Sequence, residues 1–511
     1  MSADNPQVPH RGLLTICVMA ATIMQALDTT IANVALPYMQ GSLSATQDQI
    51  TWVLTSYIVS AAIMMPTTGF FSARFGRKKL LIAAVTGFTI ASGLCGAAQT
   101  LGQMVVFRLL QGVFGAALVP MSQAILLDSY PREKHGSAMA MWGVGVMVGP
   151  ILGPMLGGWL TEYYNWRWVF YINVPIGIAV VFGLVAVLSE SKLQDTRFDW
   201  FGFATLSLAV GALQMMLDRG QLIDWFSSRE IILEATLSGL ALYLFVVHST
   251  TAEKPFIDPR LFADHNFRVG IALIFVVGVI LLASIALLTP YLQTLMGYPV
   301  LTAGLILGPR GVGTMIAMMI VGRLINRIDP RVFLMIGFGL TAISLNEMTT
   351  FTPDVASTTL LWNGIVQGFG LGFLFTPLST VTFATLPPHL RTQATSLFSL
   401  LRNLGSSIGV SVVMFMLERN TQAMHSQLAQ YATPLNPALH APFVSQIWNL
   451  KTLAGRTALN MEITRQAEII AYMNDYKLMA ILALAATPLV LLLGKPQAQR
   501  NADPAHAAAM E

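Results

Sequence analysis

Long apolar runs separated by short polar connections make up most of the chain. A membrane-spanning helix needs about 20 mostly apolar residues, and this window predicts fourteen spans. They cover residues 13–36, 50–71, 80–99, 103–127, 136–160, 168–188, 198–217, 230–249, 268–290, 301–323, 332–350, 358–384, 394–417 and 477–494. The runs do not alternate between apolar and polar residues, which excludes a transmembrane barrel. We therefore predict an all-α integral membrane protein.

Composition supports this class and narrows the chemistry. Of the 511 residues, 54% are hydrophobic and 11% are charged, whereas soluble proteins carry about 25% charged residues. The net charge of +4 does not indicate nucleic-acid binding. The chain has no phosphate-binding loop for ATP and no Cys or His cluster at metal-ligand spacing. We expect no enzyme activity, no cofactor, no metal and no catalytic residue.

Basic residues indicate the orientation in the membrane. They concentrate in one alternating set of loops, as in "RFGRKK" at 74–79, whereas the short loops of the other set contain only Arg167, Arg219 and Arg229. Since cytoplasmic loops are enriched in Lys and Arg, both termini and the 495–511 tail are predicted to be cytoplasmic. The segment 418–476 then lies on the outer side and is long enough to form a small structure of its own.

An internal repeat divides the chain. "VPMSQAILLDSYPREKHGSAMA" at 119–140 is similar to "TPLSTVTFATLPPHLRTQATS" at 376–396, and a Gln-Gly pair precedes each copy. Such repeats in transporters place the substrate between two halves near mid-membrane. The predicted organisation is six helices, two inserted helices and six helices. The corresponding ranges are 1–190, 191–267 and 268–494, the last with the outer segment 418–476, followed by the tail 495–511.

Asp28 lies within the first apolar run, in "LDTTIANVALP" at 27–37. Gln25 and Asn33 share the polar side of the predicted helix with it. Loss of water favours the protonated form of a carboxylic acid, and an acid inside the membrane is a functional candidate. Two interpretations remain open: Asp28 binds a proton or a charged substrate group, or it is held in an ion pair or helix contact.

Arg108, in "RLLQG" at 108–112, is the natural partner for this acid. Because arginine does not deprotonate, Arg108 either biases a nearby carboxylate towards ionisation or extends to the outer membrane surface. We predict that Asp28 and Arg108 couple transport to protons. Further polar residues of the spans are predicted to line the substrate pathway: Gln25, Asn33, Gln111, Gln367, Arg402 and Asn403.

Two glycine patterns indicate close packing or movement. In "GVGVMVGPILGPMLGG" at 143–158, glycines recur every four residues and form a ridge without side chains. This ridge is predicted either to pack one helix tightly or to seal the two halves against each other, with prolines inviting a bend. The predicted gating and packing residues are the ridge glycines Gly145, Gly149, Gly153 and Gly157, with Pro150 and Pro154. The inner loop "GFFSARFGRKK" provides a second candidate, with Gly69 and Gly76 for a tight turn and Arg74 and Arg77 for ion pairs, although topology alone also explains its charges.

Together these motifs resemble the major facilitator superfamily, and more narrowly its fourteen-span EmrB/QacA-type drug:proton antiporters of the EmrB branch. The resemblance covers nearly the whole chain and includes "NWRWVFYINVPIGI" at 165–178. It implies the major facilitator fold and proton-driven multidrug efflux of hydrophobic toxic compounds, giving antibiotic resistance. In the EmrB branch it also implies a bacterial inner-membrane location and a tripartite pump with a periplasmic adaptor protein and an outer-membrane channel.

One departure from the superfamily pattern concerns the inner loop. Ala73 and Asn326 stand where the superfamily usually has an acid in the two copies of the motif, so a charge relay through that acid is not expected. Rival functions are a proton-coupled transporter of one specific metabolite or lipid, and a non-transporting membrane scaffold. The sequence names neither the substrates nor the proton stoichiometry, the oligomeric state or the role of the two inserted helices.

Overall fold

The computed structural model describes residues 11–190, 193, 198–441, 444 and 447–494, and every regular element in these ranges is a helix. The helices and their bounds are α1 (Arg11–Ser42), α2 (Gln47–Ile50), α3 (Trp52–Met64), α4 (Thr67–Phe75), α5 (Arg77–Ala97), α6 (Leu101–Gly115), α7 (Leu118–Ser129), α8 (His135–Tyr163), α9 (Trp168–Tyr171), α10 (Asn173–Val187), α11 (Trp200–Arg219), α12 (Arg229–Thr251), α13 (Arg260–Ala263), α14 (His265–Pro290), η3 (Tyr291–Leu295), α15 (Val300–Leu324), α16 (Pro330–Met348), α17 (Ser357–Ala384), α18 (Pro388–Ala429), α20 (Leu453–Ala486) and η5 (Thr487–Leu492).

The predicted all-α membrane architecture is confirmed. Thirteen helical segments of the described residues are long and apolar enough to cross a membrane, and the bent pair α3–α4 brings the number to fourteen. The predicted span 50–71 is this pair, which bends by 57°. The bend occurs at Pro66, because proline cannot donate a helix hydrogen bond and its ring clashes with the preceding turn.

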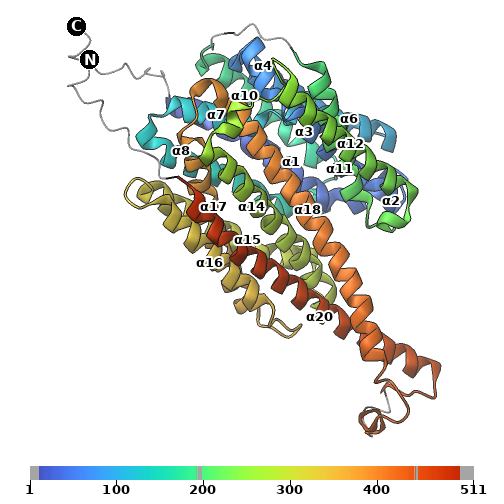
Figure 1. The fold of residues 1–511 in the computed structure, drawn as a ribbon. Helices are drawn as coiled ribbons and strands as arrows, with labels where there is room; N and C mark the ends of the chain where they lie inside the picture. Colours follow the sequence, from blue (N-terminus) through green and yellow to red (C-terminus); the bar gives the residue numbers. More distant parts are fainter. Residues whose placement is uncertain (1–10, 191–192, 194–197, 442–443, 445–446, 495–511) are drawn as a thin grey trace, which may run out of the picture.

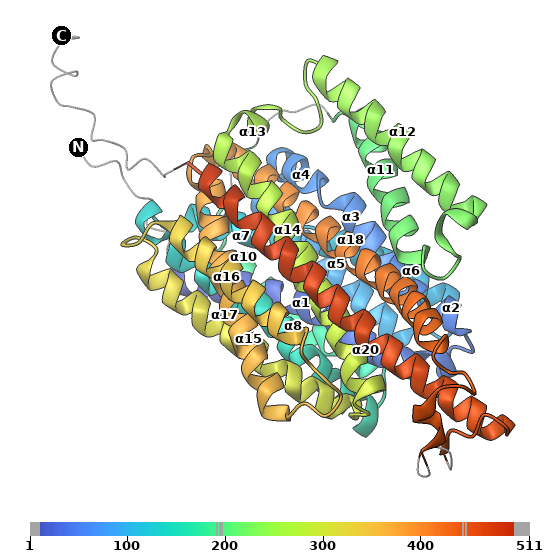
Figure 2. The same ribbon diagram turned by 60° about the horizontal axis from the view of Figure 1, so that its bottom comes forward.

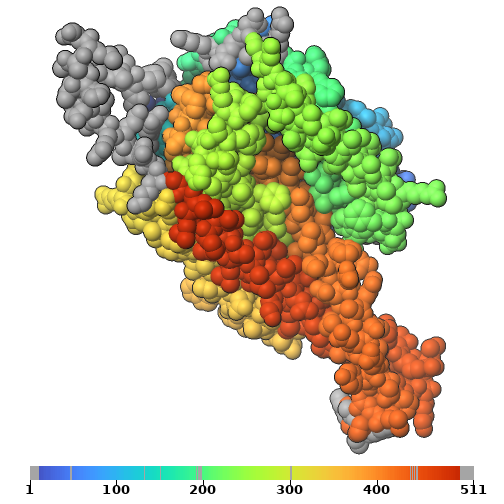
Figure 3. Space-filling model, in the orientation of Figure 1, coloured from blue at the N-terminus to red at the C-terminus, as the bar shows by residue number. Residues whose placement is uncertain are grey.

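The two ends of the bundle differ. We call one end of the bundle the terminal end. Helix α1 begins there at Arg11, the α4–α5 turn lies there, and the Arg331 side chain donates there to the Leu493 carbonyl. We call the opposite end of the bundle the hairpin end. There α18 and α20 extend beyond the other helices and are joined by residues 430–452 (Figure 1). The space-filling view shows this extension as a separate projection (Figure 3). Most of the predicted outer segment 418–476 is therefore helix.

The helices pack as two groups, α1–α10 and α14–η5, which we call the N-terminal and C-terminal helices. Within them α1 packs on α8, and α15 packs on α17. Between them α8 packs along α15, and α18 contacts α4 and α7. Helices α11 and α12 pack on each other at the edge of the bundle, where α11 reaches α3 and α18 (Figure 2). The division into six, two and six helices stays a prediction; the 191–197 boundary, except residue 193, and the 495–511 tail lie outside the described residues.

Candidate functional site

Asp28 lies inside the N-terminal helices and is fully buried. Its carboxylate is 0% exposed and faces Arg108 of α6, whose side chain is 1% exposed. The Arg108 Nη1 atom donates to Asp28 Oδ2 at 2.7 Å. The alternative in which Arg108 extends to the membrane surface therefore does not describe this structure. A buried ion pair of this kind is costly to desolvate and persists only where further hydrogen bonds satisfy both groups.

Arg108 has such partners on three sides. Its Nε donates to the Val53 carbonyl of α3 at 2.9 Å, and Nη1 also donates to Gln111 Oε1 at 2.8 Å. The guanidinium carbon lies 4.3 Å from the centre of the Tyr57 ring and 5.6 Å from that of Phe170. Stacking on aromatic faces stabilises a cation without adding a negative charge. Asp28 is thus the one acidic side chain that pairs with Arg108 among the described residues.

Amide donors satisfy the second oxygen of Asp28. Gln111 Nε2 donates to Asp28 Oδ1 at 2.8 Å, and Asn173 Nδ2 donates to the same atom at 3.1 Å. Asn173 Nδ2 also lies 3.0 Å from Ser92 Oγ. Both oxygens of this buried carboxylate are therefore hydrogen-bonded, as buried polar groups nearly always are. Protonation of Asp28 would break this balance and leave Arg108 without an anion.

The other predicted pathway residues of α1 are placed differently. Gln25 Nε2 donates to the Tyr57 hydroxyl at 3.1 Å, which joins it indirectly to the ring that covers Arg108. Asn33 is exposed and donates to the Thr29 carbonyl of its own helix at 3.3 Å. The structure therefore brings Gln111 and Gln25 to the Asp28 site and leaves Asn33 on an open surface.

The predicted pathway residues of the C-terminal helices do not bond with this site. Gln367 is 0% exposed, and neither atom of its amide has a hydrogen-bond partner within the described residues. Arg402 is half-buried, and its Nη2 lies 3.4 Å from Oδ1 of the adjacent Asn403.

The glycine ridge of α8 faces α1. A Cβ at Gly149 would meet the Ala26 backbone, one at Gly153 would meet Thr30, and one at Gly157 would lie 3.0 Å from Ile31. Gly145 faces Met19, which also lies in α1. The ridge therefore packs α8 within the N-terminal helices, because only glycine allows this approach.

Another face of α8 meets the C-terminal helices. Gly143 lies against Met318 of α15, and Gly311 of α15 lies against Ile151. The expected seal between the two groups therefore runs beside the ridge and not along it. A Cβ at Gly304 would be 3.9 Å from Pro154, which lies on this side, and the side chain of Pro150 lies outside the described residues.

The inner-loop motif takes part in a contact between the two groups at the terminal end. Gly76 separates α4 from α5 with φ 87°, a conformation that glycine adopts at little cost. Arg77 forms an ion pair with Asp128 at the end of α7, and the other oxygen of Asp128 pairs with Arg391 of α18. A Cβ at Gly69 would lie 2.9 Å from Gln393. Arg74 lies in the last turn of α4.

Sequence reasoning missed three residues of these contacts. Asn173 and Tyr57 complete the Asp28 site, and Asp128 provides the acid that the inner-loop motif lacks at Ala73. Asn173 lies in the quoted stretch 165–178, and Asp128 lies in the repeated stretch 119–140. The signals were present, but nothing in one-dimensional spacing joins α10 to α1 or α7 to α18.

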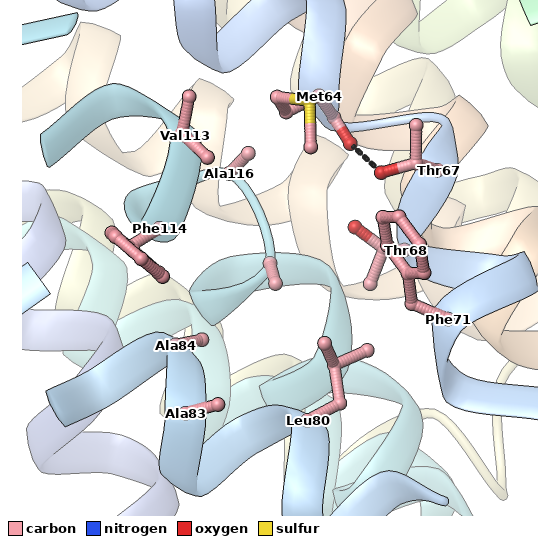
Figure 4. Close-up of a pocket in the computed structure, with 11 residues that line it drawn as sticks. Met64, Thr67, Thr68, Phe71, Leu80, Ala83, Ala84, Val113, Phe114 and Ala116 are labelled. Atoms are coloured by element: carbon pink, nitrogen blue, oxygen red, sulfur yellow. Dashed lines mark hydrogen bonds between the residues drawn. The ribbon is translucent and has the colours of Figure 1, made fainter. Parts of the chain in front are cut away.

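A cavity of about 130 Å³ lies near the breaks between α3 and α4 and between α6 and α7 (Figure 4). Its lining is mainly apolar and includes Met64, Phe71, Leu80 and Phe114. Thr67 contributes a hydroxyl that donates to the Met64 carbonyl at 2.6 Å. The cavity contains no charged side chain and is separate from the Asp28 site. Among the described residues no group of three or more His, Cys, Asp or Glu side chains could hold a metal ion.

Comparisons with known proteins agree with this architecture. The family model described as "Major Facilitator Superfamily" matches residues 18–410. The multidrug export protein EmrB of Haemophilus influenzae is 37% identical over 489 residues, which cover 95% of this chain and 96% of that protein. The fatty acid resistance protein FarB of Neisseria gonorrhoeae is 38% identical over 501 residues, which cover 96% and 98%.

Solved structures show the same fold at low sequence identity. The proton:xylose symporter XylE superposes with a TM-score of 0.60 at 12% identity, covering 96% of this chain and 100% of that one. The human organic anion transporter MFSD10 gives 0.61 at 14% identity, covering 94% and 100%. The motifs "LDTTIANVALP" and "RLLQG" predicted an EmrB-type member of this superfamily. The family match over most of the chain and the near-full-length similarity to EmrB confirm that prediction. The chain is a multi-pass membrane transporter and not an enzyme, and it belongs to the major facilitator superfamily as an EmrB-type member.

Proposed function

We propose that this protein exports hydrophobic toxic compounds in exchange for protons, with Asp28 as the proton-binding acid and Arg108 as its coupling cation. The buried Asp28–Arg108 pair at 2.7 Å is the observation that supports this most directly. The names of relatives, which include multidrug export and fatty acid resistance, support multidrug efflux and the substrate class.

The Asp28 site can couple a proton to a conformational change because its balance of charge depends on protonation. With Asp28 ionised, the carboxylate holds Arg108, Gln111 and Asn173 together and so joins α1, α6 and α10. A proton on Asp28 removes the attraction to Arg108 and favours an arrangement in which these helices separate. A ligand shifts such an equilibrium only through different affinities for the two states.

The observed arrangement corresponds to an outward-facing state in this proposal. The terminal end is closed by the Asp128 ion pairs and by Thr395 Oγ1, which donates to the Pro120 carbonyl at 2.9 Å. Towards the hairpin end, Asn33 and Leu305 are exposed. The terminal end then faces the cytoplasm of a bacterial cell, with both termini cytoplasmic and the protein in the inner membrane.

The projection at the hairpin end is the proposed docking site for a periplasmic adaptor, which would connect the transporter to an outer-membrane channel. Large apolar side chains of this projection face solvent: Tyr431 is 71% exposed, Leu435 89% and Leu453 75%. These side chains are available for contact with a partner protein. The projection extends away from the other helices, as a contact outside the membrane requires (Figure 3).

Dye efflux from proteoliposomes under an imposed pH gradient tests the proposal. Wild type is expected to move several chemically distinct dyes against their gradients, and Asp28→Asn is expected to bind dye without moving it. Asp224→Asn is the matched control, because Asp224 is an exposed acid in a left-handed turn that asparagine also adopts. Equal efflux by Asp28→Asn and wild type would place the coupling elsewhere. If wild type moved none of the dyes, transport of one metabolite or lipid, or a scaffold role, would replace multidrug export.

A further inference from the structure

Arg310 of α15 is a buried cation without a negative partner. It is 6% exposed, and no acidic side chain of the described residues forms an ion pair with it. Its Nη2 donates to Ser284 Oγ at 3.0 Å and to the Leu281 carbonyl at 3.2 Å, while Nη1 has no hydrogen-bond partner in the part of the chain that the structure describes. Arginine cannot lose its charge as lysine can. A buried guanidinium therefore calls for an anion, since an unpaired charge inside a protein is costly.

The internal repeat shows what is missing beside Arg310. The Gln-Gly pairs at Gln111 and Gln367 align the two halves with a shift of 256 residues, and the same shift places Ser284 at the position of Asp28. Each half thus directs a guanidinium at the same point of its first helix, Arg108 from α6 and Arg310 from α15. The first half has a carboxylate at that point, and the second half has a hydroxyl.

Other buried polar groups around Arg310 are also unsatisfied. Gln367 lies next to Gly368, and a Cβ at Gly368 would meet the Arg310 carbonyl. Within the described residues the Gln367 amide has no hydrogen-bond partner, and neither has the hydroxyl of Tyr476 of α20, which lies near Arg310. Buried polar groups are nearly always hydrogen-bonded. Three sets of potential donors, from α15, α17 and α20, therefore lack an acceptor in the same part of the C-terminal helices.

The position of Arg310 suits a ligand that enters between the two groups of helices. The next residue, Gly311, packs against Ile151 of α8, so Arg310 lies one residue from the contact between the groups. Transporters built from two repeats handle substrates at that boundary. Gly364 of α17 also lies against Arg310, with 3.7 Å from a Cβ at Gly364 to Arg310 Cβ, so α17 keeps the surroundings of the cation narrow.

We propose that Arg310, with Gln367 and Tyr476, binds the anionic group of the exported compound, so that this transporter takes hydrophobic compounds that carry a carboxylate. The inference rests on the proposed export function and names a substrate class and a site for it. The guanidinium would donate to the carboxylate through Nη1, and the amide and hydroxyl would complete its coordination. Arginine is suited to this task because its planar donors match carboxylate oxygens. Inorganic chloride is the other anion that this chemistry admits.

A matched pair of ligands tests the site in full-length protein in nanodiscs. Binding of decanoate and of its neutral amide, decanamide, is measured by calorimetry for wild type, Arg310→Gln and Arg310→Lys. Wild type is expected to prefer the carboxylate by about 10- to 100-fold, the usual range for a hydrogen bond to a charged group. Arg310→Gln should abolish the preference, and Arg310→Lys should restore part of it. Arg465→Gln, which removes an exposed arginine, should behave as wild type.

The outcomes separate this inference from the proposed function. Equal binding of decanoate and decanamide by wild type in both chloride and gluconate overturns the site, as does an unchanged preference in Arg310→Gln. If decanoate binds wild type no better than the amide in chloride but does so in gluconate, chloride is the occupant and the substrate assignment is wrong. Folding of Arg310→Gln is checked separately by its unfolding transition, followed by tryptophan fluorescence in mixed micelles. Loss of neutral-dye efflux in wild type would reject the export function itself, whatever the carboxylate preference.

Discussion

Removal of the negative charge at Asp28 should destabilise the fold by an amount that reports its protonation state. In Asp28→Asn the side-chain oxygen still accepts from Gln111 and Asn173. Arg108 keeps its bonds to the Val53 carbonyl and Gln111 but loses its anion. Breaking a buried pair from one side typically costs about 3–5 kcal/mol. Because most hydrogen bonds survive the change, we expect about 3 kcal/mol.

A double-mutant cycle isolates the contribution of the charges. Arg108→Gln removes the cation, and the double variant Asp28→Asn/Arg108→Gln leaves an all-amide cluster with no buried charge. Since the cost arises from leaving one charge alone, the double variant should be more stable than the sum of the single losses predicts, with a coupling energy of about 2–3 kcal/mol. The assay is reversible unfolding in mixed micelles, followed by the fluorescence of the nine tryptophans.

The cycle refutes the ion-pair reasoning if Asp28→Asn costs less than about 0.5 kcal/mol and the coupling is near zero. Such a result would mean that Asp28 is already neutral in this state, since replacing a protonated acid by an amide changes no charge. The proton would then be bound while the N-terminal helices are packed, and the direction of the proposed cycle would have to be reversed. An intermediate value cannot arise from surface screening, because both side chains are at most 1% exposed.

Two further predictions concern packing and closure. Gly149→Ala should destabilise the protein by about 1–3 kcal/mol in the same unfolding assay, because its Cβ would meet the Ala26 backbone, whereas Gly158→Ala has open space and should cost nothing measurable; equal effects would contradict the α1–α8 packing. Asp128→Asn removes the shared partner of Arg77 and Arg391 at the terminal end. A single reporter cysteine at buried Thr395, with Cys17 and Cys95 replaced by alanine, should therefore be labelled several-fold faster in Asp128→Asn than in the control Asp224→Asn. Unchanged labelling would show that other contacts close the terminal end.

The sequence predicted those features that depend on one helix at a time. Apolar runs define spans because a backbone in lipid must satisfy its own hydrogen bonds, so the fourteen predicted segments correspond to thirteen helices and one bent pair. The ends of the helices were less predictable. Helix α18 continues to Ala429, beyond the predicted span 394–417, and α20 already begins at Leu453, before the predicted span 477–494. A hydropathy window cannot see this extension, because a polar helix outside the membrane gains its stability from its neighbour.

Features that depend on several helices were predicted only in part. Asp28 and Arg108 could be paired in advance because both are rare charges in apolar runs. Asn173 escaped notice because an amide in a span has no such rarity, although it donates to Asp28 at 3.1 Å. The glycine ridge was recognised, but spacing cannot say whether its neighbour is α1 or α15. Arg310 is a charge within an apolar run, but only the structure shows that its guanidinium faces the Ser284 hydroxyl.

In the proposed proton-coupled cycle, the buried pair accounts for a costly acid in the first span. Two hydrophobic residues of similar volume would hold α1 and α6 together about as well, since the desolvation of both charges offsets much of their attraction. Such a contact would have a single state. The Asp28–Arg108 pair has two, because one proton converts an attractive contact into an isolated buried cation. In the proposed cycle, a carboxylate held in an ion pair and a carboxylate that carries a proton are the same group in two steps, and proton binding releases the contact between α1 and α6.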